Sequence, residues 1–253
     1  MIVLETIAVA FAMFSALPVP RVEWNRQNMR YTLCAFPLVG AALGGGCWLW
    51  VWLCGILSLP DLLRGAGLCL LPALLTGGIH LDGWADTQDA LASWAAPERR
   101  REILKDPHLG AFAAIRLCMY FAASLALWTA LPEYRAGAVL CLFCLSRTLS
   151  GLALTLFPLA EGSGLARSFA EAADRKRVRG SLLALAAALC AAMVPLGGWP
   201  MLPAAAGVFL YYRRMARVKF GGVSGDLAGW FLQTAELWML GALCLWEFVE
   251  KLL

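Results

Sequence analysis

The chain has 253 residues, of which 61% are hydrophobic and only 15% are Asp, Glu, Lys or Arg, and its mean hydropathy is +0.70. Soluble domains carry about 25% charged residues, so this composition excludes an ordinary water-soluble globule and a disordered chain. It predicts an all-α, polytopic membrane protein that forms a single integral domain over residues 1–253. The net charge is only +4, and we do not expect nucleic acid as a partner.

About seven transmembrane helices are expected, each near the roughly 20 residues that cross a hydrocarbon layer. Residues 6–20 are apolar but too few to cross, and they end in two prolines, which favours an N-terminal interfacial or re-entrant helix. Residues 180–212 are too long for one crossing, and Pro195 and Pro200 mark a turn that divides them. The predicted spans are 33–60, 65–79, about 111–132, 136–160, the two halves of 180–212, and 227–246.

The segments that connect these spans alternate between basic and nearly neutral ones. Lys and Arg gather in four connecting segments and are sparse in the connections between them. Since Lys and Arg are retained on the cytoplasmic side, the four segments are predicted to lie on the cytoplasmic side of the inner membrane and the C-terminus on the opposite side. The segments are residues 21–30, 80–106, 161–179 and 213–226.

Three acids follow the second predicted span: Asp82, Asp86 and Asp89. At about 100° per residue, positions i, i+4 and i+7 of a helix fall within about 60° of one another, so the three carboxylates share one face. Such a cluster at a membrane edge needs a cation, and carboxylate oxygens are the ligands that Mg²⁺ prefers. The alternative is a solvated helix whose acids are only favoured by its macrodipole.

Two further motifs lie in segments assigned to the same side. One contains Lys105 and Asp106, and the other is Gly221-Gly222-Val223-Ser224-Gly225-Asp226. The glycines can expose backbone amides to a phosphate, Lys219 lies nearby as a counter-charge, and both aspartates add to the acidic set. Each motif also has a simpler explanation, since a glycine-rich connection is often only a turn and a proline after Asp106 can end a helix.

Charged residues inside predicted spans should face the bundle interior. Arg147 is a candidate for binding a phosphate, whereas Arg116 also fits an arginine that extends to the interface, and Glu236 fits an ion pair with an arginine. His80 is a candidate substrate-binding residue, although an isolated histidine at an interface is often structural. Clustered carboxylates, Mg²⁺, arginines and a glycine-rich loop together indicate phosphoryl or nucleotidyl transfer.

With these motifs the sequence resembles the cobalamin synthase family, the adenosylcobinamide-GDP ribazoletransferases. The resemblance covers most of the chain and depends on several motifs in order. They are Phe36-Pro37-Leu38-Val39-Gly40, residues 76–89 (TGGIHLDGWADTQD), Ile103-Leu104-Lys105-Asp106 with Leu109-Gly110, Ser146-Arg147, and residues 221–226 (GGVSGD).

The resemblance implies a magnesium-dependent membrane transferase of cobalamin biosynthesis. Such an enzyme transfers the phosphocobinamide moiety of adenosylcobinamide-GDP to α-ribazole or α-ribazole 5′-phosphate and releases GMP. It also implies that Asp82, Asp86 and Asp89 bind the metal and that Asp106 and Asp226 complete the catalytic set. The candidate substrate-binding residues are His80, Lys105, Arg147, Gly221, Gly222 and Gly225. The lower base, the preferred form of ribazole and the oligomeric state stay open.

Two alternatives remain at this level. A membrane alcohol phosphotransferase of phospholipid synthesis also places Asp-Gly and further acids at a membrane edge, but that family has an arginine where Asp86 stands here. A cation-coupled transporter would use Arg116, Arg147 and Glu236 as its pathway. The acids of this chain gather at one interface instead of the bilayer midplane, which disfavours transport.

Overall fold

The computed structural model describes residues 2–252, apart from the side chain of Tyr134, and it confirms the predicted all-α class. Within that range the chain forms α-helices, one short 3-10 helix at Glu133–Arg135, and a single isolated β-bridge between Leu159 and Val223. The helices are α1 Ile2–Phe14, α2 Arg26–Met29, α3 Thr32–Ile56, α4 Asp61–Thr76, α5 Ile79–Ala92, α6 Pro97–Ile103, α7 Ala111–Ala130, α8 Ala136–Leu156, α9 Gly164–Ala172, α10 Arg175–Met193, α11 Met201–Phe220 and α12 Gly225–Glu250.

Each predicted span coincides with a helix, but fewer of these helices qualify as membrane spans by length and composition. Among the described residues α3, α7 and α8 qualify, and α4 with α5 makes a fourth span if this bent pair is counted as one. Helices α10, α11 and α12 stand where the fifth, sixth and seventh spans were predicted. Basic residues in α10 and α11, and Gln233 and Glu236 in α12, make these helices less apolar. The expected number of seven is therefore larger than this test gives.

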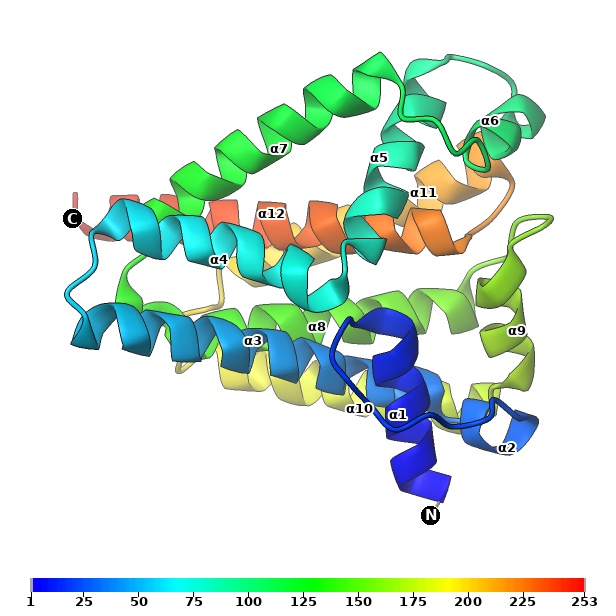
Figure 1. The fold of residues 1–253 in the computed structure, drawn as a ribbon, viewed down its shortest axis with the longest axis horizontal. Helices are drawn as coiled ribbons and strands as arrows, with labels where there is room; N and C mark the ends of the chain where they lie inside the picture. The colour runs from blue at the N-terminus through cyan, green and yellow to red at the C-terminus, as the bar shows by residue number, and fades with distance from the viewer. Residues whose placement is uncertain (1, 253) are drawn as a thin grey trace.

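Most of the long helices run side by side along the long axis of the molecule, and their connections gather at two ends (Figure 1). One end holds α2, α5, α6, α9 and the junction of α11 with α12, and we call it the site end. The far end holds the α3–α4, α7–α8 and α10–α11 connections and the end of α12. The four basic segments all lie at the site end, as the predicted alternation requires.

The N-terminal helix differs from its prediction in position. It covers Ile2–Phe14 instead of residues 6–20, and it is too short to be counted among the candidate spans. Pro18 and Pro20 lack the backbone N–H that a helix needs, so the segment after Phe14 leaves the helical conformation. In Figure 1 α1 crosses α3 near the site end, which places Phe14 close to the functional region described below.

The centre of the bundle depends on close contact between α3 and α8. A Cβ atom on Gly40 would clash with the backbone carbonyl of Phe143, and one on Gly44 would lie 2.6 Å from a side-chain carbon of Leu140. Glycines four residues apart let two helix backbones approach closely, which strengthens packing inside a membrane where the hydrophobic effect between helices is weak.

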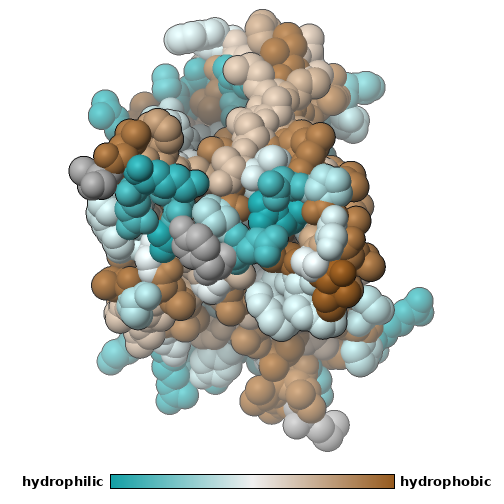
Figure 2. All heavy atoms as spheres, turned by 90° about the vertical axis from the view of Figure 1, so that its left-hand side faces the viewer, coloured by the Kyte–Doolittle hydropathy of each residue, from teal (hydrophilic) through white to brown (hydrophobic). Residues whose placement is uncertain are grey.

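The far end is held by compensated charges. Arg64 is buried and lies 3.2 Å from both Asp61 and Glu133. Arg135 forms ion pairs with Glu247 and, at 3.0 Å, with Glu250. Figure 2 shows this end face-on, with hydrophilic residues over its middle and hydrophobic residues around them. Each buried arginine there has more than one carboxylate partner.

Candidate active site

The site begins at a sharp bend between α4 and α5. Gly77 and Gly78 separate the two helices and have φ angles of 64° and 78°, a left-handed conformation that side chains other than glycine rarely adopt. The bend between the helix axes is 95°. Helix α5, which carries the predicted acids, therefore lies across the site end and does not continue the direction of α4 (Figure 1).

Two further glycines bring α5 against the start of α12. A Cβ on Gly83 would lie 2.7 Å from the Cα of Asp226, and one on Gly229 would lie 2.7 Å from the carbonyl oxygen of His80. The two helices thus touch backbone to backbone at both points. This contact explains why Asp82 and Asp226, distant in sequence, lie at one place at the site end.

The carboxylates at this place repel one another. Asp82 is exposed, while Asp86 and Asp226 are half-buried. Burial, followed by the negative charges of Asp82 and Asp226, raises the pKa of the Asp86 carboxyl to about 7. Burial and the charge of Asp82 also raise the pKa of Asp226. Negative charge is therefore concentrated at this one place in the site end, although the end as a whole is rich in basic residues.

Asp89 has a partner already. Its Oδ2 accepts a hydrogen bond of 2.6 Å from Gly110 N, and its Oδ1 accepts one of 2.8 Å from Ala113 N. These amides belong to the first turn of α7, so Asp89 caps this helix from a neighbouring one. Gly110 is required at this point because a Cβ there would clash with the Asp89 carboxylate.

Lys105 and Asp106 are neighbours in sequence but differ in their placement. Lys105 lines the cavity described in the next paragraph, and its Nζ would lie 2.9 Å from a Cβ on Gly162. Asp106 points to solvent, where hydrogen bonds from His108, including one of 3.0 Å from its backbone N–H, hold the pKa of the Asp106 carboxyl below its ordinary value. The structure thus brings Lys105 into the site and leaves Asp106 outside the cavity.

A cavity of about 340 Å³ opens between α1, α3, α5, α8, α9 and α12. Its wall has an acidic part with Asp82 and Asp226, and an apolar part with aromatic side chains. His80 belongs to this wall. Burial, with the nearby charge of Arg147, lowers the pKa of His80 to about 3, so the imidazole is neutral. Other residues of the wall are Phe14, Phe36, Lys105, Ser163, Phe169 and Gly225.

The glycine-rich loop divides between two tasks. Gly221 ends α11 with a φ of 77°, and Gly222 packs so tightly against the backbone around Leu159 that a Cβ would lie 2.5 Å from the Leu159 carbonyl carbon. These two glycines therefore shape the loop and do not line the cavity. Gly225 does line it and has no atom within 4 Å of the position of a Cβ, so its backbone is accessible there.

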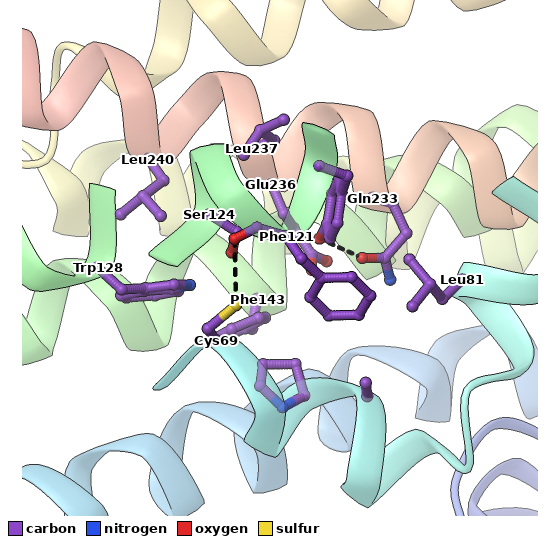
Figure 3. Close-up of a pocket in the computed structure, with 13 residues that line it drawn as sticks. Cys69, Leu81, Phe121, Ser124, Trp128, Phe143, Gln233, Glu236, Leu237 and Leu240 are labelled. Atoms are coloured by element: carbon purple, nitrogen blue, oxygen red, sulfur yellow. Dashed lines mark hydrogen bonds between the residues drawn. The ribbon is translucent and has the colours of Figure 1, made fainter. Parts of the chain in front are cut away.

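Arg147 is fully buried in the bundle, where it forms an ion pair with Glu236 and, at 2.8 Å, a hydrogen bond with Ser146. The predicted pairing of Glu236 with an arginine is therefore confirmed. Figure 3 shows Glu236 and Gln233 beside a second, smaller cavity of about 20 Å³. Arg147 does not line the 340 Å³ cavity, so contact with a phosphate there stays a prediction.

Among the described residues no group of three His, Cys, Asp or Glu side chains stands close enough together to hold a metal ion without further ligands. The donors still fit Mg²⁺, which commonly takes one or two carboxylates and completes its shell with water and substrate phosphates. Asp82 and Asp86 supply such carboxylates. Burial, together with the charges of the neighbouring aspartates, raises the pKa of Asp86, and a bound cation would oppose both effects. The three-aspartate metal site stays a prediction.

Comparison with known proteins identifies the family. A sequence model described as cobalamin-5-phosphate synthase matches residues 6–244, nearly the whole chain. The chain belongs to the cobalamin-5-phosphate synthase family. No solved structure matches it.

Similar proteins that are named adenosylcobinamide-GDP ribazoletransferase include the following three. The one from Lachnoclostridium phytofermentans is 39% identical and covers 92% of this chain and 91% of its own length. The one from Pseudomonas putida is 36% identical, with 94% and 97% covered, and the one from Desulfitobacterium hafniense is 33% identical, with 92% and 94% covered. The resemblance found in the sequence motifs is thereby confirmed.

Several residues of the site were not singled out from the sequence. Gly83 and Gly229 make the helix contact, and a glycine inside a helix is a usable signal because it is costly there unless another backbone approaches. Phe36 belongs to one of the family motifs but had no role assigned to it. Phe14, Phe169 and Ser163 gave no signal, since they lie in apolar or mixed stretches far apart in sequence. Only the packed structure, with α1 against α3 and α9 against α8 and α12, shows that they share a cavity.

Proposed function

We propose that this chain is an adenosylcobinamide-GDP ribazoletransferase whose reaction takes place where Asp82 and Asp226 line one cavity. Two observations support this function. The family match extends over residues 6–244, and relatives that match over nine tenths of the chain have this name. The juxtaposition of the two acids beside Lys105 supplies the groups that phosphoryl transfer needs.

The reaction joins two substrates and releases a nucleotide. The oxygen of a ribose hydroxyl of α-ribazole, or of its 5′-phosphate, forms a bond to the phosphorus attached to cobinamide. The bond from this phosphorus to the oxygen shared with GMP breaks, and GMP leaves with that oxygen. The proton of the hydroxyl passes to a carboxylate. Asp226 suits this role, because burial raises its pKa and thus its affinity for a proton.

The remaining residues bind and orient the diphosphate. Asp82 and Asp86 would hold Mg²⁺, which neutralises charge on the diphosphate when bound. Lys105 supplies a positive charge at the wall, and the open backbone at Gly225, in the first turn of α12, faces the same cavity. Asp89 acts through α7, whose first turn it caps. We place this site on the cytoplasmic side of the inner membrane, because the four basic segments lie at the site end.

The experiment is the release of GMP from membranes that contain the chain. They are incubated with adenosylcobinamide-GDP, α-ribazole 5′-phosphate and Mg²⁺, and GMP and the cobalamin product are measured together. We expect GMP and the cobalamin product in equal amounts. Chelation of the metal should abolish the formation of both, and membranes with the Asp82→Asn variant, the control, should form neither. Uptake of substrate into sealed vesicles with no GMP would instead favour a transporter.

A further inference from the structure

Part of the wall of the 340 Å³ cavity has no role in the chemistry proposed at Asp82 and Asp226. Four aromatic rings from four different parts of the chain meet in it. Phe14 lies 4.2 Å from Phe36 and 5.9 Å from Phe169, measured between ring centroids, and it stacks on His80 at 6.3 Å with an interplanar angle of 25°. This cluster forms the apolar part of the wall. Its shape and chemistry suit a flat aromatic ligand.

Two buried polar atoms in the same wall have no hydrogen-bond partner among the described residues. They are Nε2 of His80, whose side chain belongs to a residue only 5% exposed, and Oγ of Ser163, in a residue 8% exposed. Ser163 occupies the N-cap position of α9, where a serine hydroxyl normally accepts a hydrogen bond from the helix, yet it makes no such bond here. Buried polar groups are costly without a partner, so both point to a ligand that supplies one.

We propose that this apolar part of the cavity binds the aromatic base of α-ribazole. Of the two unpartnered groups, His80 Nε2 and Ser163 Oγ, one would hydrogen-bond to the single free ring nitrogen of the base and the other to a hydroxyl of its ribose. The proposal rests on the proposed function and assigns one of its two substrates to one part of the site. The base would lie among Phe14, Phe36 and Phe169, and the ribose would extend toward the acids. Its hydroxyl would then face Asp226, which lines the same cavity.

Size and polarity decide against the other candidate occupants. Ligand cavities range over about 300–1,000 Å³, so one of about 340 Å³ accepts a nucleoside but not the corrin ring with its amide side chains. Guanine carries several donors and acceptors along its edge, whereas the benzimidazole of α-ribazole has one free ring nitrogen, which better matches a wall with few polar atoms. A lipid chain would leave His80 Nε2 and Ser163 Oγ without partners.

The test separates the two substrates kinetically in the full-length chain reconstituted in lipid nanodiscs. With Phe14→Ala we expect the KM for α-ribazole to rise about tenfold and the KM for adenosylcobinamide-GDP to stay within about twofold. The matched control is Phe209→Ala, because Phe209 is also half-buried among aromatic residues but lies outside the cavity. Ser163→Ala, a change that removes a single hydroxyl, should raise the same KM by a smaller factor.

The remaining outcomes are informative. If the wild-type chain releases GMP while Phe14→Ala and Ser163→Ala leave the KM for α-ribazole unchanged, the base lies elsewhere and this inference is wrong. A rise only in the KM for the GDP substrate would place guanine in the cavity and also overturn it. If the wild-type chain releases no GMP, the proposed function itself fails, and direct titration of the nanodiscs with α-ribazole still shows whether the nucleoside binds.

Discussion

The two ends of the bundle differ in whether their key charged side chains form ion pairs. At the far end Arg64 and Arg135 are buried, and each lies between two carboxylates. At the site end Asp82, Asp86 and Asp226 come together with no arginine or lysine in an ion pair with them among the described contacts, and the pKa of Asp86 rises to about 7. Paired charges can hold helices together, whereas a cluster of like charges destabilises the protein unless a bound cation offsets the repulsion. The comparison thus separates structural acids from those of the site.

The sharpest way to break the comparison is to remove one site carboxylate. Asp82→Asn or Asp86→Asn should reduce GMP release by about a thousandfold, because each variant loses a charged ligand for the metal that would bind the diphosphate. The measurement is turnover at saturating substrate, with helix content followed by circular dichroism. Asp61→Asn is the matched control at the far end, where the side chain is 77% exposed and turnover should stay near normal. Near-normal turnover in both site variants would contradict the assignment.

A second prediction concerns the contact that brings the acids together. Gly83→Ala should lower turnover more than about tenfold, because the added Cβ would lie 2.7 Å from the backbone of Asp226 and would force α5 away from α12. Turnover and the KM for both substrates are measured. Gly45→Ala is the control, since no atom lies within 4 Å of a Cβ there. Equal turnover in the two variants would show that the contact does not position the site.

A third prediction concerns the far end, where substitutions should change the free energy of unfolding but not the turnover. Glu247→Ala removes one partner of buried Arg135 and should lower the free energy of unfolding by about 3 kcal/mol. Unfolding in sodium dodecyl sulfate, followed by circular dichroism, measures the loss. Glu250→Ala removes the more exposed partner and should cost less than about 1 kcal/mol. A large loss of turnover by folded Glu247→Ala protein would contradict the division between the ends.

The smallest effect is expected at Asp89. Asp89→Ala removes the acceptors for two amides of α7 and should cost about 1 kcal/mol, with turnover reduced only a few-fold. Asp89→Asn keeps one side-chain oxygen and should cost less. Both are compared with Asp82→Asn in the same GMP assay and by thermal unfolding. If Asp89→Asn abolished turnover as Asp82→Asn should, Asp89 would belong with the metal ligands.

Much of this arrangement could be predicted from the sequence, because periodicity and charge placement act over short distances. Helical spacing put Asp82 and Asp86 on one face, and the alternation of basic segments put Asp226 at the same end. What sequence reasoning could not supply was the direction of individual side chains. Asp89 shares the predicted face but reaches α7, and Asp106 shares the predicted end but points to solvent. Such choices depend on which backbone amides lie within reach, which only the packed structure determines.

The contact between Gly83 and Asp226 joins two parts of the chain that are synthesised at different times. The two residues are far apart in sequence, and α12 follows all the other described helices in the chain. A nascent chain that has inserted everything before α12 holds Asp82 and Asp86 but lacks Asp226, Gly225 and the opposite wall of the cavity. If Asp226 has the role proposed above, a copy without α12 should release no GMP, because it lacks both this carboxylate and one wall of the cavity.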